Sequence, residues 1–260
     1  MTLLAMVRKM WWNMIKIEQT EISGFGAAIR GMRNPMNSWD KMDSHVCNYD
    51  EYDCDCPMVA NGDEPGEECN DGKWKFCVGE NDYALMKRLA DGGSCHAKYR
   101  RMMLVTCDIT APLYWWKEFD TYKVGTVANS CSTMHKIHAK EFTLDDFSHE
   151  HLTPAAAATL STVVERLNFA RRQFLNGRNN SDIGMPSAKE YWWDMIQLLP
   201  SSYNQKRTVL LNYEVLANIY KWRKDHKLDE WRDFCRWIEQ LPYSNVIVRG
   251  CGCIADEQGR

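Results

Sequence analysis

Two stretches of the sequence carry most of the side chains that could do chemistry. The first, residues 92–136, starts at a glycine turn with His96, continues through a strand-like run and reaches Glu118 and Lys123. It ends in a loop of small polar side chains: Thr126, Asn129, Ser130, Cys131, Ser132 and Thr133. Such a loop, with its backbone N–H groups, can hold a phosphate. Hydroxyl-rich loops are also common where nothing binds, so the sequence pattern leaves both interpretations open.

The second stretch is "NYEVLANIYKWRKDH", residues 212–226. Its apolar residues have helical spacing, and Asn212 and Arg223 are separated by about three turns, so they share a helix face. A guanidinium in that place could bind a phosphate or carboxylate through two hydrogen bonds. The alternative is an ordinary surface arginine on an amphipathic helix.

The composition argues against several classes of protein. The chain has 260 residues, of which 45% are hydrophobic and 26% are charged, as in an ordinary globular protein. The net charge of −3 gives no general attraction to nucleic acid or to an anionic membrane, so neither is expected as a partner. The sequence contains no apolar run of about 18 residues, so no membrane span is predicted. The first residues also lack the pattern of a signal peptide. With an odd number of cysteines, these features predict a cytoplasmic protein.

The apolar periodicity predicts a single α+β domain over residues 14–245, with residues 1–13 as an extension and 246–260 as a tail. Strands are expected at 14–21 and 101–110. Helices are expected at 23–35, 81–93, 111–125, 153–177, 187–200, 212–226 and 228–242. We expect Asn81 and Thr153 as N-caps, and Gly92 and Gly177 as helix ends.

Residues 43–80 are acidic, rich in cysteine and without apolar periodicity, which indicates a long loop or insertion. It contains Cys47, Cys54, Cys56, Cys69 and Cys77. The close pair Cys54-x-Cys56 does not have the spacing of a zinc knuckle, so solvated thiols are favoured over a zinc site. Cys251-x-Cys253 could supply two further ligands, but no metal site is predicted.

The two stretches together resemble the flavin-dependent thymidylate synthases, the ThyX family. His96 matches the family's turn histidine, and "VTCDITAPLYWWKEFDTYK" then runs without a gap to the family signature. The late stretch keeps the family's spacing of Asn212, Leu216, Asn218 and Arg223, followed by Glu230-Trp231. The resemblance covers about residues 14–40 and 79–242.

The resemblance includes clear departures from the family pattern. The family's Arg-His-Arg triplet is Thr121-Tyr122-Lys123 here, and the next serine is Thr126. The later serine of the signature matches Cys131 or Ser132, and the arginine after Asn212 is Glu214. Each lost arginine removes a charge-assisted contact to phosphate, so other basic residues such as Lys98 and Lys123 must replace it, or the ligand has changed, or binding is lost.

The resemblance implies an antiparallel sheet with flanking helices, a homotetramer with active sites between subunits, and the cofactors FAD, NADPH and methylenetetrahydrofolate. The substrate would be a pyrimidine deoxynucleotide, dUMP or dCMP. The implied cofactor-binding residues are His96, Lys98, Tyr122, Asn212 and Asn218. The implied nucleotide-binding residues are Arg223, Glu118, Ser130 and Ser132, and the implied catalytic residues are Glu118, Lys123, Thr126, Cys131 and Ser132.

Glu118 stands where the family often has glutamine, and a carboxylate prefers a donor such as the amino group of cytosine. This favours dCMP. Glu118 and Arg223 are expected to line one pocket. The alternative function is a protein of the same fold that binds a nucleotide or a protein without catalysis.

Overall fold

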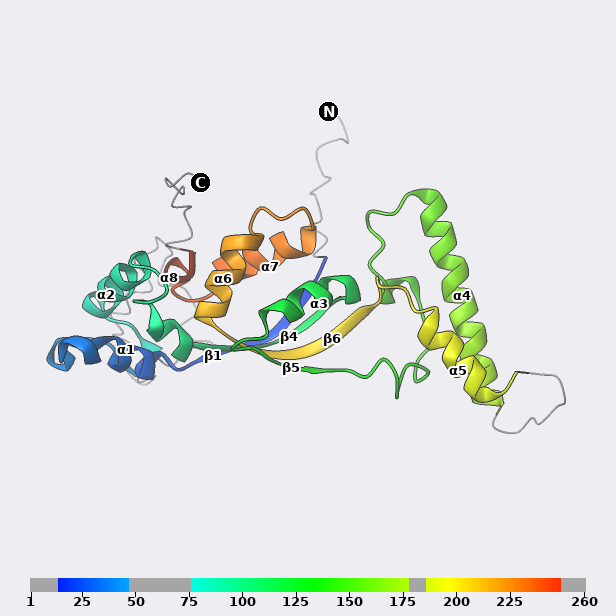
Figure 1. The fold of residues 1–260 in the computed structure, drawn as a ribbon, viewed down its shortest axis with the longest axis horizontal. Helices are drawn as coiled ribbons and strands as arrows, with labels where there is room; N and C mark the ends of the chain where they lie inside the picture. Colours follow the sequence, from blue (N-terminus) through cyan, green and yellow to red (C-terminus); the bar gives the residue numbers. More distant parts are fainter. Residues whose placement is uncertain (1–13, 47–75, 178–185, 249–260) are drawn as a thin grey trace, which may run out of the picture. The chain divides into compact units, whose positions relative to one another are not determined.

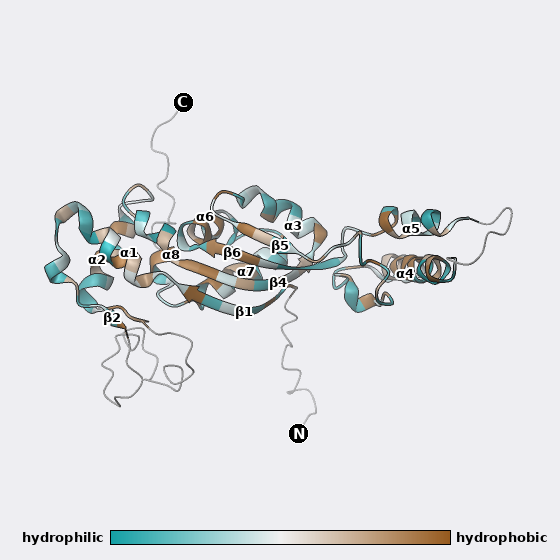
Figure 2. Cartoon of the chain, turned by 90° about the horizontal axis from the view of Figure 1, so that it is seen from below, coloured by the Kyte–Doolittle hydropathy of each residue, from teal (hydrophilic) through white to brown (hydrophobic). Residues whose placement is uncertain are grey.

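The computed structural model describes residues 14–46, 76–177 and 186–248. It confirms the expected fold class, a mixed α/β fold in which helices flank an antiparallel sheet (Figure 1). The sheet has four strands in the order β1-β4-β6-β5. The strands are β1 (Lys16–Ser23), β4 (Leu104–Pro112), β5 (Val127–Ser130) and β6 (Asn204–Asn212). Figure 2 shows hydrophobic residues along these strands, in brown.

Each of the two central strands passes directly into a helix. Strand β4 ends at Pro112 and α3 (Leu113–Phe119) begins at the next residue, while β6 ends at Asn212 and α6 (Tyr213–Arg223) follows it. The N–H of Leu113 donates to the Tyr203 carbonyl, and the N–H of Tyr213 donates to the Met103 carbonyl, both at 3.0 Å. The two bonds fit one antiparallel register, which fixes where each helix starts.

The chain forms two compact units. The first unit comprises Met1–Lys16, Ile109–Thr121 and Asn129–Thr208, and the second comprises Ile17–Asp108, Tyr122–Ala128 and Val209–Arg260. Strand β4 runs from the second unit into the first, and β6 runs from the first into the second. Helix α3 therefore belongs to the first unit and α6 to the second.

The first unit is built on α4 (Pro154–Asn176) and α5 (Ala188–Gln197), which lie side by side. Their apolar faces enclose a core with Ile137, Phe142 and Phe147. A short 3₁₀ helix, η6 (Leu144–Asp146), precedes them. Asn168 ties α4 to this core, because its side-chain amide both accepts from the N–H and donates to the carbonyl of Phe142, at 2.8 Å each. Helix α3 of the same unit buries Trp115, Trp116 and Phe119.

The second unit gathers the remaining helices around the other half of the sheet. These are α1 (Phe25–Arg33), α2 (Glu80–Asp91), α6, α7 (Asp229–Glu239) and α8 (Asn245–Val248), with the 3₁₀ helices η1 (Asn34–Met36), η2 (Trp39–Lys41) and η4 (Lys98–Met102). A further 3₁₀ helix, η5 (Asp120–Tyr122), spans the boundary of the units. Helix η4 packs against both α1 and α6. Val246 and Ile247 are fully buried, so the predicted tail boundary falls inside a packed helix.

Strand pairing and hydrogen bonds join the two ends of the predicted insertion in the second unit. Strands β2 (His45–Val46) and β3 (Phe76–Cys77) pair antiparallel, and two carboxylates close the junction behind them. Asp43 accepts from the N–H groups of Asn81 and Asp82 at 2.8 and 3.0 Å. In return, the buried Asp82 accepts from the Ser44 N–H and hydroxyl and from Arg33 Nε, the last at 2.6 Å.

Most predicted helices are present, with local corrections at their ends. Thr153 caps α4 and Gly177 ends it, as predicted. Asn81 does not cap α2, because Gly79 precedes the helix and the first donors of α2 are bonded by Asp43 instead. The helix expected at 111–125 is shorter: Ala111 and Pro112 belong to β4, and α3 ends at Phe119. No strand was predicted for β6, where Lys206 and Arg207 break the apolar alternation.

Several predictions about chain segments lie partly or wholly outside the described residues. The extension 1–13, Cys47, Cys54, Cys56 and Cys69, and the pair Cys251-x-Cys253 belong to this group. Cys77, by contrast, is described and is disulfide-bonded, which corrects the expectation of free thiols for this cysteine. Among the described residues, α4 is the longest helix, and neither it nor any other helix has the length and apolarity to cross a membrane.

The Asp43 carboxylate gives a testable dependence of stability on pH. Burial works to raise the pKa of Asp43, but the hydrogen bonds from the Asn81 and Asp82 N–H groups outweigh it and hold the pKa below 3.8. Because the folded pKa is lowered, this stabilisation is present above that pH and is lost as the pH falls through the folded pKa. Asp43→Ala should lower the free energy of unfolding by about 0.5–2 kcal/mol at neutral pH, the usual cost of losing a helix cap.

Urea unfolding measured from neutral to acid pH checks this expectation. The difference between the native chain and Asp43→Ala should narrow as the pH falls below 3.8. Asp40→Ala is the matched control, since Asp40 is exposed and only three residues away in the sequence. A difference that stays constant over the whole pH range contradicts the role given to the Asp43 charge.

Candidate functional site

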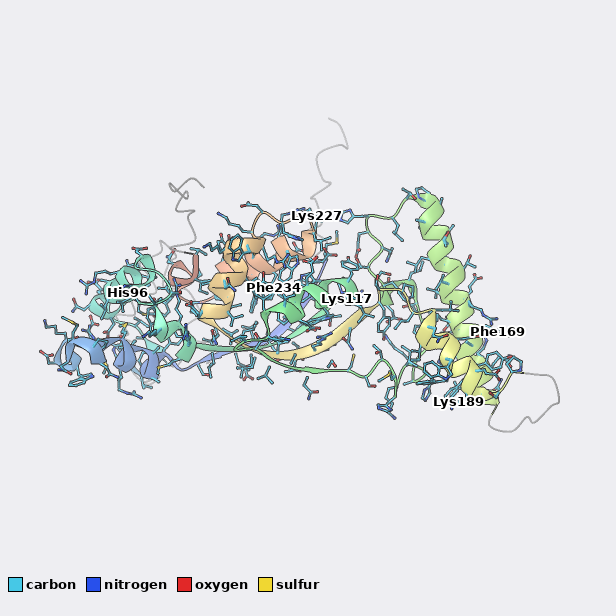
Figure 3. The ribbon with its side chains drawn as sticks, in the orientation of Figure 1. His96, Lys117, Phe169, Lys189, Lys227 and Phe234 are labelled. Atoms are coloured by element: carbon cyan, nitrogen blue, oxygen red, sulfur yellow. The ribbon has the colours of Figure 1, made fainter. Side chains whose placement is uncertain are left out.

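The turn that carries His96 depends on two glycines. Gly93 has a φ of +88°, a left-handed conformation that glycine adopts without strain, and its carbonyl accepts from the N–H of His96 at 3.0 Å. Gly92 leaves room for the imidazole, because a Cβ there would lie 3.2 Å from His96 Cδ2. The turn therefore holds the His96 side chain at the end of α2 (Figure 3).

This turn forms one wall of a large pocket in the second unit, which we call the α1–α2 pocket. Its volume is about 1060 Å³, at the upper end for small-molecule sites. The lining includes Met32, Lys41, Leu85, Arg88, His96 and Lys98. The predicted cofactor residues His96 and Lys98 are thus brought together, although each is exposed at the rim rather than buried.

The far wall of the α1–α2 pocket is one face of α2. Asn81, Leu85 and Arg88 follow one another at a spacing of four and three residues, so they share that face, while Asp82 and Met86 point into the core. At the base, the hydroxyl of the buried Tyr99 donates to the Met86 carbonyl at 2.8 Å. Burial raises the pKa of Tyr99, so this hydroxyl stays protonated.

A second group of side chains surrounds Arg223, and we call Tyr122, Arg223, His226 and Trp231 the Arg223 cluster. Nε of Arg223 donates to the Tyr122 hydroxyl at 2.9 Å, and Nη1 lies 3.0 Å from Nε2 of His226. The guanidinium carbon lies 4.7 Å from the centre of the Trp231 ring and 5.6 Å from that of Tyr122. These distances are typical of cation–π contact, so the plane of the guanidinium is fixed on several sides.

His226 connects the Arg223 cluster to the loop before α7. Its Nδ1 accepts from the Leu228 N–H at 3.2 Å, while Nε2 faces Arg223. A neutral imidazole has one acceptor nitrogen, so it accepts from only one of these two donors at a time. The loop and Arg223 therefore compete for the ring. Arg232 fixes the same loop by donating to the His226 carbonyl.

The segment after Tyr122 runs along α6 and ends at its N-terminus. Thr126 Oγ1 donates to the Tyr122 carbonyl at 2.7 Å. Gly125, with a φ of +81°, is so close to Asn212 that a Cβ there would lie 2.9 Å from Asn212 Nδ2. Asn212 itself caps α6, because its Oδ1 accepts from the Val215 N–H at 3.0 Å. The structure thus brings Tyr122, Thr126, Asn212 and Arg223 to the two ends of one helix.

The predicted phosphate loop 126–132 is corrected by the structure. Residues Val127–Ser130 form the exposed strand β5 rather than a loop. The Cys131 N–H donates to the Lys206 carbonyl at 3.0 Å, and the Cys131 carbonyl accepts from Gln205 Nε2 at 2.9 Å. An extended strand that pairs with β6 along one edge spaces its N–H groups out, whereas a phosphate loop gathers them around one anion.

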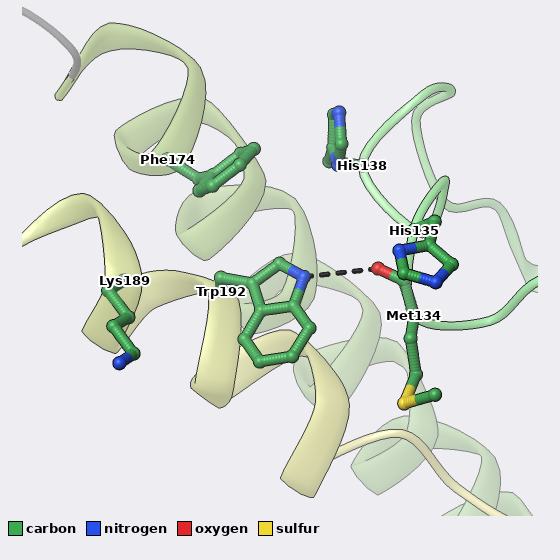
Figure 4. A pocket seen from close by; sticks show the side chains of 6 residues that line it. All are labelled: Met134, His135, His138, Phe174, Lys189 and Trp192. Atoms are coloured by element: carbon green, nitrogen blue, oxygen red, sulfur yellow. Dashed lines mark hydrogen bonds between the residues drawn. The ribbon is translucent and has the colours of Figure 1, made fainter.

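Ser132 precedes the turn that supplies Met134 and His135 to a smaller pocket in the first unit, whose lining side chains are drawn in Figure 4. Its hydroxyl accepts from the N–H groups of Met134 and His135, at 3.3 and 2.9 Å, and so shapes the turn that follows β5. The pocket, of about 390 Å³, is lined by Met134, His135, His138, Phe174, Lys189 and Trp192. The indole of Trp192 donates to the Met134 carbonyl at 3.1 Å.

The remaining predicted site residues are scattered over the two units. Glu118 is half-buried on α3, in the first unit, whereas Lys123 and Asn218 are exposed in the second. Because Glu118 and Arg223 belong to different units, their sharing of one pocket stays a prediction. Asn212 caps its own helix, since its Oδ1 accepts from the Val215 N–H, and its assignment to the cofactor stays a prediction.

Sequence reasoning assigned no site role to four residues that the structure adds to these sites. His226 and Trp231 complete the Arg223 cluster, and Lys41 and Arg88 complete the cationic rim of the α1–α2 pocket. The spacing of Arg223 and His226, three residues apart in a helical stretch, was a usable signal. Lys41 and Arg88 are far apart in the sequence, and no local pattern connects them.

The described residues fit a phosphate-bearing cofactor better than a metal ion. Within residues 14–46, 76–177 and 186–248, no group of three or more His, Cys, Asp or Glu side chains could hold a metal. The α1–α2 pocket instead combines Lys41, Arg88 and Lys98 with apolar walls. Cationic donors suit phosphate oxygens, and apolar walls suit a ring system.

Comparison with known proteins identifies the fold. No protein-family model matches the chain, and neither does any curated protein. Among solved structures, thymidylate synthase X (ThyX) from Helicobacter pylori with FAD and dUMP aligns with 91% of this chain and 98% of its own, at a TM-score of 0.56 and 12% identity. The chain has the ThyX fold. A second Helicobacter pylori ThyX structure with the same ligands gives a TM-score of 0.55, at 14% identity over 87% of this chain and 94% of its own.

The Arg223 cluster generates a test of its own. Tyr122→Phe removes the oxygen that accepts from Arg223 Nε, and the partly buried donor then has to find another partner. We expect the free energy of unfolding to fall by about 1–3 kcal/mol, the usual cost of such a loss. Tyr220→Phe is the matched control, since Tyr220 lies on the same helix and its hydroxyl donates to Glu239 at an exposed site.

Both variants can be measured by urea unfolding followed through tryptophan fluorescence. Tyr220→Phe should cost less than about 1 kcal/mol because water replaces an exposed bond. Equal destabilisation by the two variants would show that the Tyr122–Arg223 hydrogen bond contributes no more to stability than an exposed one.

Proposed function

We propose that the protein is a flavin-dependent enzyme of the thymidylate synthase type, which transfers a one-carbon unit from methylenetetrahydrofolate to C5 of a pyrimidine deoxynucleotide. The observation that carries this proposal is the fold match, over nearly the whole length of both chains, to ThyX with FAD and dUMP. The α1–α2 pocket and the Arg223 cluster support it, because they place cationic and aromatic side chains in the second unit.

The proposed roles follow from the chemistry of each side chain. FAD would carry hydride from NADPH to the transferred carbon, and the protein would position the reactants. His96, Lys98, Tyr122, Asn212 and Asn218 are proposed for the cofactor. Arg223, Glu118, Ser130 and Ser132 are proposed for the nucleotide, with the guanidinium as the phosphate ligand. Lys123, Thr126 and Cys131, together with Glu118 and Ser132, are proposed to act at the reacting base.

Assembly is part of the proposal. By resemblance, the enzyme would be a homotetramer in the cytoplasm, with active sites formed between subunits. Such sites would collect residues that are scattered over the two units of one chain, such as Glu118 and Arg223. The proposal does not require membrane or nucleic-acid partners.

The second candidate function is a ThyX-fold protein that binds a nucleotide or a protein without turnover. The sequence at the signature favours it, since Thr121-Tyr122-Lys123 stands in place of Arg-His-Arg. Arg223 adds to this argument, because its Nε is already bonded to Tyr122. The two functions differ in whether flavin and one-carbon transfer are present.

Flavin binding is the first test. The purified protein should show flavin absorbance, or should gain thermal stability when FAD is added, because a ligand that binds only the native state stabilises it. Differential scanning fluorimetry with and without FAD measures this directly. A colourless protein whose melting temperature is unchanged by FAD would remove the enzymatic proposal and leave the non-catalytic one.

Glu118 allows a test of the substrate. A carboxylate accepts a hydrogen bond from the cytosine amino group, whereas an amide can also donate to the uracil carbonyl. We expect labelled carbon from methylenetetrahydrofolate to enter dCMP in the native enzyme, and Glu118→Gln to shift the preference toward dUMP by about tenfold or more. Labelling of dUMP alone by the native enzyme would refute the assignment of dCMP.

A further inference from the structure

The charged side chains at the rim of the α1–α2 pocket are all positive. Lys41 on η2, Arg88 on α2 and Lys98 on η4 reach its rim from three separate elements, and His96 stands beside Lys98. No Asp or Glu is among the described residues that line it. Asp82, which is buried on another face of α2, forms an ion pair with Arg33, whose Nε lies 2.6 Å from Oδ1 of the carboxylate.

The cations of the α1–α2 pocket differ from several arginines elsewhere in the described residues, which form ion pairs. Arg33, Arg207 and Arg236 each have an aspartate within ion-pair distance. Within the described ranges, neither Lys41 nor Arg88 has an acidic side chain at that distance, and both are exposed to solvent at the pocket. Three like charges around one opening repel each other, so an anion between them relieves that repulsion.

The apolar walls between the charged side chains suit a planar ring of a ligand. Met32 from α1 and Leu85 and Leu89 from α2 provide apolar surface, and Tyr99 lies at the base. The volume, about 1060 Å³, exceeds what an inorganic ion or a simple carboxylate would fill. A ligand that pairs a planar ring with two adjacent phosphates matches both the surface and the charges.

We propose that the α1–α2 pocket binds the adenosine diphosphate portion of a dinucleotide cofactor, with Lys41 and Arg88 as ligands of the diphosphate. The two side chains replace the positive charge that the sequence lacks at Thr121 and at Glu214. Lys98 is the third cation, and the apolar face of α2 holds the adenine. This inference rests on the proposed function for the identity of the cofactor, because FAD and NADPH share the adenosine diphosphate group.

Binding measurements on the full-length protein test the pocket. The variants are Lys41→Met, Arg88→Met and the double variant, and the probes are FAD, NADPH and ADP, each measured by isothermal titration calorimetry. Lys87→Met is the matched control: Lys87 neighbours Arg88 on α2, but its ammonium lies over the Tyr83 ring at 4.3 Å and not in the pocket. Urea unfolding of each variant verifies that the fold is unchanged.

The expected result is a loss of affinity for ADP of roughly tenfold to a hundredfold in each single variant, as for a lost bond to a charged group. Lys87→Met should stay within about twofold of the native chain. Whichever of FAD and NADPH uses the pocket should lose affinity in parallel with ADP, while the other should not. This comparison tells the two cofactors apart.

Two outcomes separate this inference from the proposed function. If FAD binds the native protein but the double variant binds FAD, NADPH and ADP unchanged, the pocket proposal is overturned and the proposed function stands. If FAD does not bind but ADP binds the native protein and not the double variant, the pocket proposal stands and the flavin enzyme does not. Failure of the native protein to bind any of the three probes overturns both.

Discussion

The junctions between strands and helices control the rest of this structure. Strands β4 and β6 run antiparallel, and each becomes a helix at the residue where the strand ends. The first N–H of each helix is bonded to the carbonyl of the residue just before the other strand. A shift of one residue in this register would turn the buried faces of both strands outward and would move the starts of α3 and α6 together. Glu118 on α3 and Arg223 on α6 each lie on a helix that begins at one of these junctions.

Much of the fold was predictable from the sequence where the determinants are local. Thr153, Pro154 and Gly177 define α4 because a cap, a first-turn proline and a terminal glycine act within one turn of the helix. The glycine turn before His96 was recognisable for the same reason. Sequence reasoning failed where the determinant lies far away. The donors at the start of α2 are bonded by Asp43, which is 38 residues before Asn81, so the nearest polar residue was wrongly taken as the cap.

The candidate sites also divide into residues whose determinants are local, which the sequence reveals, and residues that only distant packing brings together. The predicted residues His96 and Lys98 line a pocket, and Tyr122 and Arg223 contact each other, because each lies near a turn or helix end that the sequence reveals. The loop 126–132 was misjudged because its composition is that of a phosphate loop, yet its backbone is bonded to β6. Lys41 and Arg88 were not found, since only tertiary packing brings η2 and the last turn of α2 to one opening. Positive charge missing from the signature is thus present elsewhere in the second unit.

The reciprocal bonds of Asp43 and Asp82 have a consequence for how this chain can vary. Val46 and Phe76 pair with each other across β2 and β3, and Asp43 and Asp82 join the chain just before β2 to the start of α2. The entropy of closing a connection grows only slowly with its length. The bonds of Asp43 and Asp82, the latter with Arg33 at the end of α1, therefore fix the start of α2 against α1 whatever the length of the connection between β2 and β3.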